Sequence, residues 1–456
     1  MEQIQKKLSE SAAARWTALT IVSVTMMFGY FFTDVMSPLE SLLTAPKGDA
    51  DGLGLGWSSS EYGWFSGAYG LMNVYLFLLF FGGIILDKFG IRLTGLAATA
   101  LMFIGAVIKW WACANDFGDA TIWVPFGGEV QAQVAYAGLG FAIYGVGCEI
   151  TGITVSKVIV KWFTGHELAL AMGLQVALAR VGTAVALGAS LPIAKALGGV
   201  SASVGLGAAC LCIGMLSFIV YNVMDKKEDK ASAAIQSEPE EGFKFSDLSV
   251  LFCNKGFWCI TFLCLAFYAG VFPFLKFATK LMIFKYGVDP EVAGRIPAML
   301  PFGTIILTPL FGSIYDKFGK GATLMIIGSI LLTLVHIVFA LPLNNWILAV
   351  VIMLVLGVAF GLVPSAMWPS VPKIIPMKQL GTAYALIFYI QNIGLAMVPM
   401  WIGSVNEKNT AADGFIDYTE TMTIFASFGV VAIIISLLLL VEDKKKGYGL
   451  QQPNVK

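Results

Sequence analysis

Twelve apolar segments of about 20 residues each divide the sequence and limit the folds open to it. A helix needs about 20 mostly apolar residues to cross a hydrocarbon core of about 30 Å. The segments lie near residues 17–38, 62–86, 93–113, 133–160, 168–194, 201–224, 257–280, 297–315, 321–342, 346–371, 380–403 and 420–441. They predict an all-α membrane protein with twelve transmembrane helices.

Composition excludes several other classes of protein. Only 13% of the residues are charged and 57% are hydrophobic, whereas soluble domains carry about 25% charged residues. The formal net charge of zero argues against a nucleic-acid partner. The seven cysteines form no CxxC pair, and the two histidines stand far apart. We therefore expect no enzyme activity, no metal and no cofactor.

Basic residues indicate the orientation in the bilayer. Most of the 29 Lys and Arg lie near the two termini and in alternate loops, and such residues are retained on the cytoplasmic side. We expect both termini to face the cytoplasm. The first apolar segment follows Lys6, Lys7 and Arg15 without a small-residue cleavage site, so it reads as a retained helix.

A short motif occurs twice, half a chain length apart. GIILDKFG at 83–90 recurs as GSIYDKFG at 312–319, each time after the second apolar segment of its half. Such a repeat is typical of a parallel duplication. It predicts two six-helix pseudo-repeats, at 1–224 and 256–441, joined by a charged cytoplasmic linker at 225–255 and followed by a cytoplasmic tail at 442–456.

The repeated motif resembles the loop signature GxxxD(R/K)xG(R/K) of the major facilitator superfamily, which Arg92 completes in the first copy. The resemblance implies a cytoplasmic gate in which Asp87 pairs with Arg92 and faces a helix N-terminus of the other half. The second copy departs from it, with Lys320 followed by Gly321. The alternative is a basic loop without a gating role. The gate candidates are Gly83, Asp87, Lys88, Gly90, Arg92, Gly312, Asp316 and Lys317.

Two charged residues fall near the middle of apolar segments. A charge inside a bilayer costs about 2.5 to 3.5 kcal/mol, so each one needs a reason. At about 1.5 Å per residue, Glu149 and Arg180 lie at equal depth near the midplane. An acid and a base at one depth suit a small zwitterion, because Glu149 can hold an ammonium and Arg180 a carboxylate. The alternative is a structural ion pair between them.

Polar and aromatic residues at a similar depth extend this candidate cavity between the halves. The further substrate-binding candidates are Asn73, Tyr69, Tyr268, Tyr384, Gln391 and, two turns below Glu149, Lys157. Lys157 can also reach the cytoplasmic interface. Asp34, Lys276 and Lys280 lie near outer helix ends, where we expect interfacial anchoring ahead of a gating role.

Several stretches resemble one branch of the superfamily, the lysosomal dipeptide uniporters. They include GVGCE at 145–149, QVALARVG at 175–182, QLGTAY at 379–384 and QNIGLA at 391–396. The resemblance implies that Glu149 holds the amino terminus of a dipeptide and Arg180 its carboxylate. It also implies facilitated diffusion, with free amino acids as poorer substrates.

The sequence lacks the targeting and glycosylation signals expected of that branch. It contains neither an acidic dileucine signal near the N-terminus nor an Asn-x-Ser/Thr sequon. We therefore favour a cell (inner) membrane over a lysosomal one, and a monomer over a complex with a glycoprotein subunit. Two other functions remain open: a proton-coupled or uncoupled organic-anion transporter using Arg180, Lys157 and Lys276, and a ligand-binding receptor that does not transport.

Overall fold

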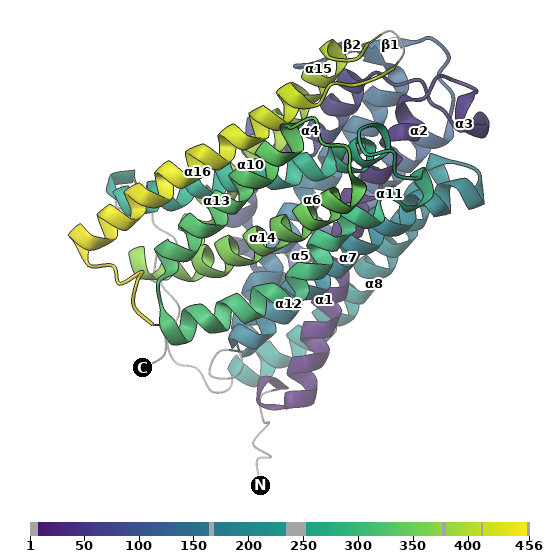
Figure 1. The fold of residues 1–456 in the computed structure, drawn as a ribbon. Coiled ribbons are helices and arrows are strands. Elements are labelled where there is room, and N and C mark those ends of the chain that lie inside the picture. The colour runs from purple at the N-terminus through teal and green to yellow at the C-terminus, as the bar shows by residue number, and fades with distance from the viewer. Residues whose placement is uncertain (1–7, 164–167, 234–251, 376–379, 412–413, 454–456) are drawn as a thin grey trace.

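Long helices lie side by side in a single bundle (Figure 1). The computed structural model describes residues 8–163, 168–233, 252–375, 380–411 and 414–453. In these ranges eleven helices are long and apolar enough to cross a membrane, and one bent pair of helices supplies a twelfth span. The predicted all-α membrane fold with twelve spans is confirmed.

The first half of the chain supplies six spans. Its long helices are α1 (Ala12–Asp34), α4 (Ser59–Tyr75), α5 (Leu78–Ala114), α6 (Ala132–Phe163), α7 (Leu168–Leu197) and α8 (Val200–Ala233). Shorter elements fill the connections: η1 (Leu8–Glu10), η2 (Ser37–Leu39), α2 (Glu40–Thr44), α3 (Asp49–Gly52), and the antiparallel hairpin of β1 (Thr121–Val124) and β2 (Gly128–Gln131). The hairpin was not predicted.

The second span is broken. It consists of α4 and the first part of α5, Leu78–Leu86, which meet at 57°. The break follows Phe77, whose φ of 53° lies in the left-handed region. The third span begins beyond a second interruption of α5 at Gly90, where φ is 79° and ψ is 173°. Glycine adopts this conformation readily, which explains its place in the repeated motif.

The second half supplies the other six spans. Its helices are α10 (Lys255–Phe284), α11 (Pro290–Ala293), α12 (Arg295–Phe318), α13 (Gly321–Ala340), α14 (Trp346–Ile374), α15 (Leu380–Lys408) and α16 (Thr419–Lys446). The Asn254 side chain caps α10 by accepting a hydrogen bond from the backbone N–H of Phe257. Helix α8 extends to Ala233, into the range expected for the linker, and residues 234–251 lie outside the described part.

Two helix pairs join the halves. Helix α4 packs on α15, and α7 packs on α12. Each pair combines the second span of one half with the fifth span of the other. This reciprocal pairing is what a parallel duplication produces when its copies face each other.

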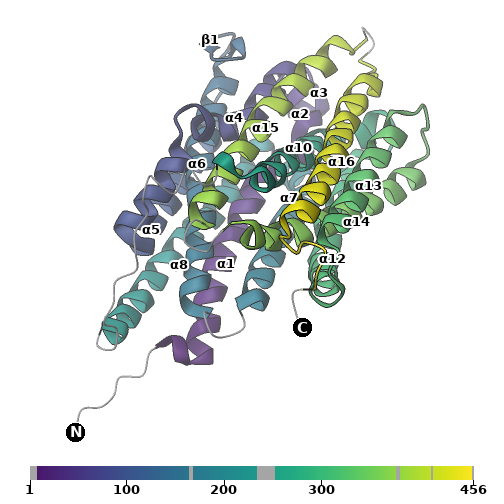
Figure 2. The same ribbon diagram turned by 90° about the vertical axis from the view of Figure 1, so that its left-hand side faces the viewer.

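The two ends of this interface differ in how closely the halves approach. Both termini lie at one end of the bundle, here called the terminal face, and the β hairpin lies at the opposite face (Figures 1 and 2). Toward the opposite face, a Cβ at Gly67 would lie 2.2 Å from the Ala396 carbonyl oxygen, and one at Gly294 would lie 2.2 Å from that of Leu187. Toward the terminal face, a Cβ at Gly173 or Gly312 would meet nothing within 4 Å. The halves are therefore closed at the opposite face and apart at these terminal-face positions.

Candidate functional site

Glu149 lies on α6 at the boundary between the halves. The Tyr69 hydroxyl of α4 donates a 2.7 Å hydrogen bond to Glu149 Oε1. Helices α4 and α6 come this close because Gly145 has no side chain, and a Cβ there would lie 2.1 Å from the Tyr69 carbonyl oxygen. A neutral side chain of the same half thus holds the acid.

Arg180 lies on α7 inside a cage of three aromatic rings. Its guanidinium carbon is 5.2 Å from the ring centre of Tyr30, 5.1 Å from that of Phe272 and 5.0 Å from that of Phe360. Tyr30 belongs to the first half, on α1, whereas the two phenylalanines belong to the second, on α10 and α14. The side chain is 8% exposed and its Nε has no hydrogen-bond partner in the described part of the chain. Ring faces stabilise the cation without satisfying its N–H donors.

Glu149 and Arg180 do not form an ion pair in this conformation. Within the described ranges, no acidic side chain lies within 4.0 Å of Arg180 and no basic one within 4.0 Å of Glu149. An acid and a base that are not paired with each other can bind the two ends of a zwitterion without first breaking a mutual salt bridge.

Aromatic residues of the second half line the same region. The Trp368 indole donates a 3.0 Å hydrogen bond to the Tyr268 hydroxyl, and the Tyr384 hydroxyl donates to the Trp368 carbonyl oxygen at 3.3 Å. Phe388 stacks on Trp368 with ring centres 5.1 Å apart. Gln391 accepts a hydrogen bond from the Cys264 thiol at 3.2 Å. The structure therefore brings Tyr268 and Tyr384 together through Trp368, and Gln391 lies against α10.

Two of the predicted substrate-binding residues, Asn73 and Lys157, have no recorded contact with Glu149 or Arg180 in the described part of the chain. Asn73 on α4 is fully buried, and neither atom of its amide has a hydrogen-bond partner in the described part of the chain. The Lys157 side chain is exposed near the terminal-face end of α6. Lys276 is engaged with Asp34 across 2.7 Å. The set of three cations on which an organic-anion site would depend is therefore dispersed.

The repeated motif lies at the terminal face. Arg92 forms ion pairs with Asp229, at 3.0 Å, and with Asp225, at 3.8 Å, both on α8 of its own half. The Asp87 side chain lies outside the described part, so its expected pairing with Arg92 stays a prediction. A Cβ at Gly83 would have only the Cβ of Ala385 nearby, at 3.9 Å.

The remaining gate candidates lie around the kink of α5 at Gly90 and toward the C-terminal end of α12. The Lys88 ammonium lies over the ring of Phe89, 5.7 Å from its centre, and the Lys317 side chain is exposed at the end of α12. Asp316 is next to it on the same helix. A gating role for these residues stays a prediction, because it concerns a state in which the terminal face is closed.

Sequence reasoning misjudged a group of charges at the opposite face. The Lys276 ammonium lies 2.7 Å from the Asp34 carboxylate, and the Lys280 ammonium lies 3.5 Å from that of Glu40. The Tyr62 hydroxyl also donates to the Lys276 carbonyl oxygen at 2.9 Å. These groups are buried or nearly so and join α1, α2 and α4 to α10. The expected interfacial anchoring is therefore wrong for these residues. They form contacts between the halves that hold the opposite face closed.

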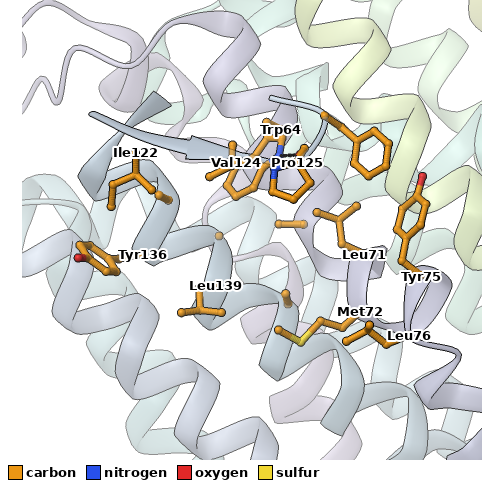
Figure 3. Close-up of a pocket in the computed structure, with 15 residues that line it drawn as sticks. Trp64, Leu71, Met72, Tyr75, Leu76, Ile122, Val124, Pro125, Tyr136 and Leu139 are labelled. Atoms are coloured by element: carbon orange, nitrogen blue, oxygen red, sulfur yellow. Dashed lines mark hydrogen bonds between the residues drawn. The ribbon is translucent and has the colours of Figure 1, made fainter. Parts of the chain in front are cut away.

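A groove of about 570 Å³ lies elsewhere, between α4, α6 and the β hairpin (Figure 3). Its walls include Trp64, Leu71, Tyr75, Val124 and Leu139. None of its lining residues is charged, and of the predicted substrate-binding residues none lines it. The groove therefore lacks the groups that would recognise a zwitterion, and it is separate from the Glu149 and Arg180 site.

Two six-helix halves around a charged interface, closed at one face of the membrane, define a membrane transporter. The family model of the Major Facilitator Superfamily matches residues 14–399, and the chain belongs to that family. It is a multi-pass membrane protein.

Curated relatives narrow the comparison. The lysosomal dipeptide transporter MFSD1 of Danio rerio is 30% identical over 343 residues, which cover 72% of this chain and 69% of that protein. The Homo sapiens protein of the same name is 28% identical over 340 residues, covering 72% and 68%.

Solved structures share the fold at low sequence identity. The nucleoside transporter NupG superposes with a TM-score of 0.66 at 15% identity over 93% of this chain and 98% of that one. A D-xylose–proton symporter gives 0.65 at 17% identity, covering 93% and 97%. A bacterial homologue of the human lysosomal transporter Spinster, inward-facing and occupied, gives 0.66 at 15%, covering 95% and 98%.

Proposed function

We propose that this protein transports dipeptides across a cell membrane by alternating access, with free amino acids as poorer substrates. In this proposal Glu149 binds the peptide amino terminus and Arg180 its carboxylate. The two halves rock about this site, so that it opens to one face of the membrane at a time.

The observation that carries the proposal is the separation of the two charges. Glu149 is held by the Tyr69 hydroxyl and Arg180 by ring faces, two of which belong to the second half. A dipeptide bound to both charges of the first half would therefore lie beside the second half at the Arg180 end, as the substrate of a rocking transporter must. The names of the curated relatives support the same substrate class.

The aromatic wall of the second half supports tolerance toward peptide side chains. Trp368, Tyr268 and Phe388 offer flat apolar faces whose polar atoms are engaged mainly with one another. Recognition would rest on the peptide termini, and the rings would accept varied side chains.

We further propose facilitated diffusion, with both termini in the cytoplasm. Both termini lie at the open terminal face, where the basic loops also cluster. Facing the cytoplasm, this conformation would be the one that exchanges substrate with the cell interior.

Counterflow in proteoliposomes tests the proposal. Vesicles loaded with an unlabelled dipeptide and given no ion gradient should accumulate labelled dipeptide transiently. The conservative variants Glu149→Gln and Arg180→Lys should each lower the rate by about 10-fold or more, because each removes a charge-assisted contact or its bidentate geometry. Unchanged counterflow in both variants would overturn the site assignment, and flux that requires a proton gradient would overturn uniport.

A further inference from the structure

Lys109 on α5 is fully buried among aromatic rings. Its ammonium nitrogen lies 4.5 Å from the ring centre of Phe32, 5.1 Å from that of Phe65 and 4.1 Å from that of Phe141. It has no hydrogen-bond partner in the described part of the chain. The site proposed for the dipeptide makes no use of this residue.

The surroundings of Lys109 give its ammonium aromatic ring faces and no hydrogen-bond acceptor in the described part of the chain. Rings from α1, α4 and α6 converge on the nitrogen, and a ring face attracts a cation but offers little to a neutral amine. A lysine buried in this way, without a carboxylate, is costly in a membrane protein. The position of Lys109 near the ion pair of Asp34 and Lys276 indicates its role.

Lys109 shares a neighbour with the ion pair that closes the opposite face. The Phe141 ring that contacts Lys109 also lies 5.9 Å from the ammonium of Lys276, which is paired with Asp34. The two lysines thus lie around one aromatic ring, and one of them is paired with Asp34.

The two lysines belong to different halves. Asp34, Lys109 and the three caging rings are on the first half, whereas Lys276 is on α10 of the second. When the opposite face opens, α10 moves away from α1 and takes Lys276 with it. Asp34 then keeps only the cations of its own half. Arg180 is one of them, but it is assigned to the substrate carboxylate.

We propose that Lys109 replaces Lys276 as the counter-charge of Asp34 when the opposite face opens. Lys276 then stabilises the closed state and Lys109 the open state, through the same carboxylate. Lys109 is a positioning residue that sets the balance between the two states and does not touch the substrate. The inference rests on alternating access in the proposed function but not on the identity of the substrate.

Hydrogen–deuterium exchange of the full-length protein in nanodiscs, without substrate, separates the two lysines. We expect Lys276→Met to speed exchange in residues 34–46 and 276–288, because the closed state loses an ion pair. We expect Lys109→Met to slow exchange there by about threefold, the size of a partly hydrated ion pair. Lys109→Arg should match the parent protein. In an Asp34→Asn background, Lys109→Met should have no further effect.

Two results would overturn the inference. One is faster exchange in Lys109→Met, as in Lys276→Met, which would mean that Lys109 only supports the packing of the first half. The other is exchange in Lys109→Met equal to that of the parent protein. The melting temperature of Lys109→Met is the control for misfolding. Because Met fills a similar volume and removes a buried charge, this melting temperature should not fall. If dipeptide counterflow fails while the opposite exchange effects persist, the substrate assignment is wrong and the role of Lys109 stands.

Discussion

The ammonium of Lys276 lies 2.7 Å from the carboxylate of Asp34 and joins α10 of the second half to α1 of the first. Lys276 also donates to the Thr33 carbonyl oxygen at 2.9 Å, so the contact is anchored by backbone as well as charge. Together with the pair of Lys280 and Glu40 it explains how the opposite face stays closed while a Cβ at Gly173 or Gly312, toward the terminal face, would meet nothing within 4 Å.

The pair of Lys280 and Glu40 should be sensitive to the loss of one partner. The Glu40 side chain is 1% exposed and the Lys280 side chain 6%. Lys280→Met would leave a buried carboxylate without a counter-charge, which costs about 3–5 kcal/mol. We expect a clearly lower melting temperature in detergent. The double variant Glu40→Gln with Lys280→Met should recover most of the loss, and a double variant no better than the single one would contradict the pairing.

Glycine positions should respond to alanine according to the space across the interface. Gly67→Ala places a methyl group 2.2 Å from the Ala396 carbonyl oxygen, so α4 and α15 must separate. We expect a lower melting temperature. The matched control is Gly173→Ala on α7, where the methyl group meets nothing within 4 Å and the helix gains about 0.5–1 kcal/mol. Equal destabilisation by both changes would count against the closed and open faces described here.

Tyr69 should matter for substrate affinity more than for folding. Its hydroxyl orients the Glu149 carboxylate at 2.7 Å, and hydrogen bonds to charged groups contribute about 1.5–3 kcal/mol. We expect Tyr69→Phe to raise the Kd for a dipeptide about 10-fold while the melting temperature changes little. Tyr75→Phe, on the same helix but with its hydroxyl on Met397 Sδ, is the control and should bind normally. Equal affinities in the two variants would remove Tyr69 from the site.

Much of the fold could be predicted from the sequence because a membrane-spanning helix is recognisable from its own apolar segment. About 20 apolar residues per segment located the spans, and the repeated motif located the two halves. The break of the second span at Phe77 could not be predicted, because the residues beside Phe77 are as apolar as the helices that they join. The β hairpin was missed because each of its strands has only 4 residues.

The candidate site was predictable only in part. Depth along a helix follows from counting residues, so Glu149 and Arg180 could be placed at one level. Which side chains face them depends on helix rotation and packing, and the cage of Tyr30, Phe272 and Phe360 therefore left no signal among so many aromatic residues. Asp34 and Lys276 were recognised as charges near outer helix ends, but their pairing across helices could not be predicted.

The most direct test of the central claim is the binding of modified dipeptides to matched variants, measured by calorimetry in detergent. Dialanine should lose about 10- to 100-fold in affinity in both Glu149→Gln and Arg180→Lys. N-acetyl-dialanine lacks the ammonium, so its weak binding should be indifferent to Glu149→Gln and still sensitive to Arg180→Lys. Dialanine amide lacks the carboxylate and should show the reverse. If both modified peptides respond equally to both substitutions, Glu149 and Arg180 do not each hold one end of the peptide.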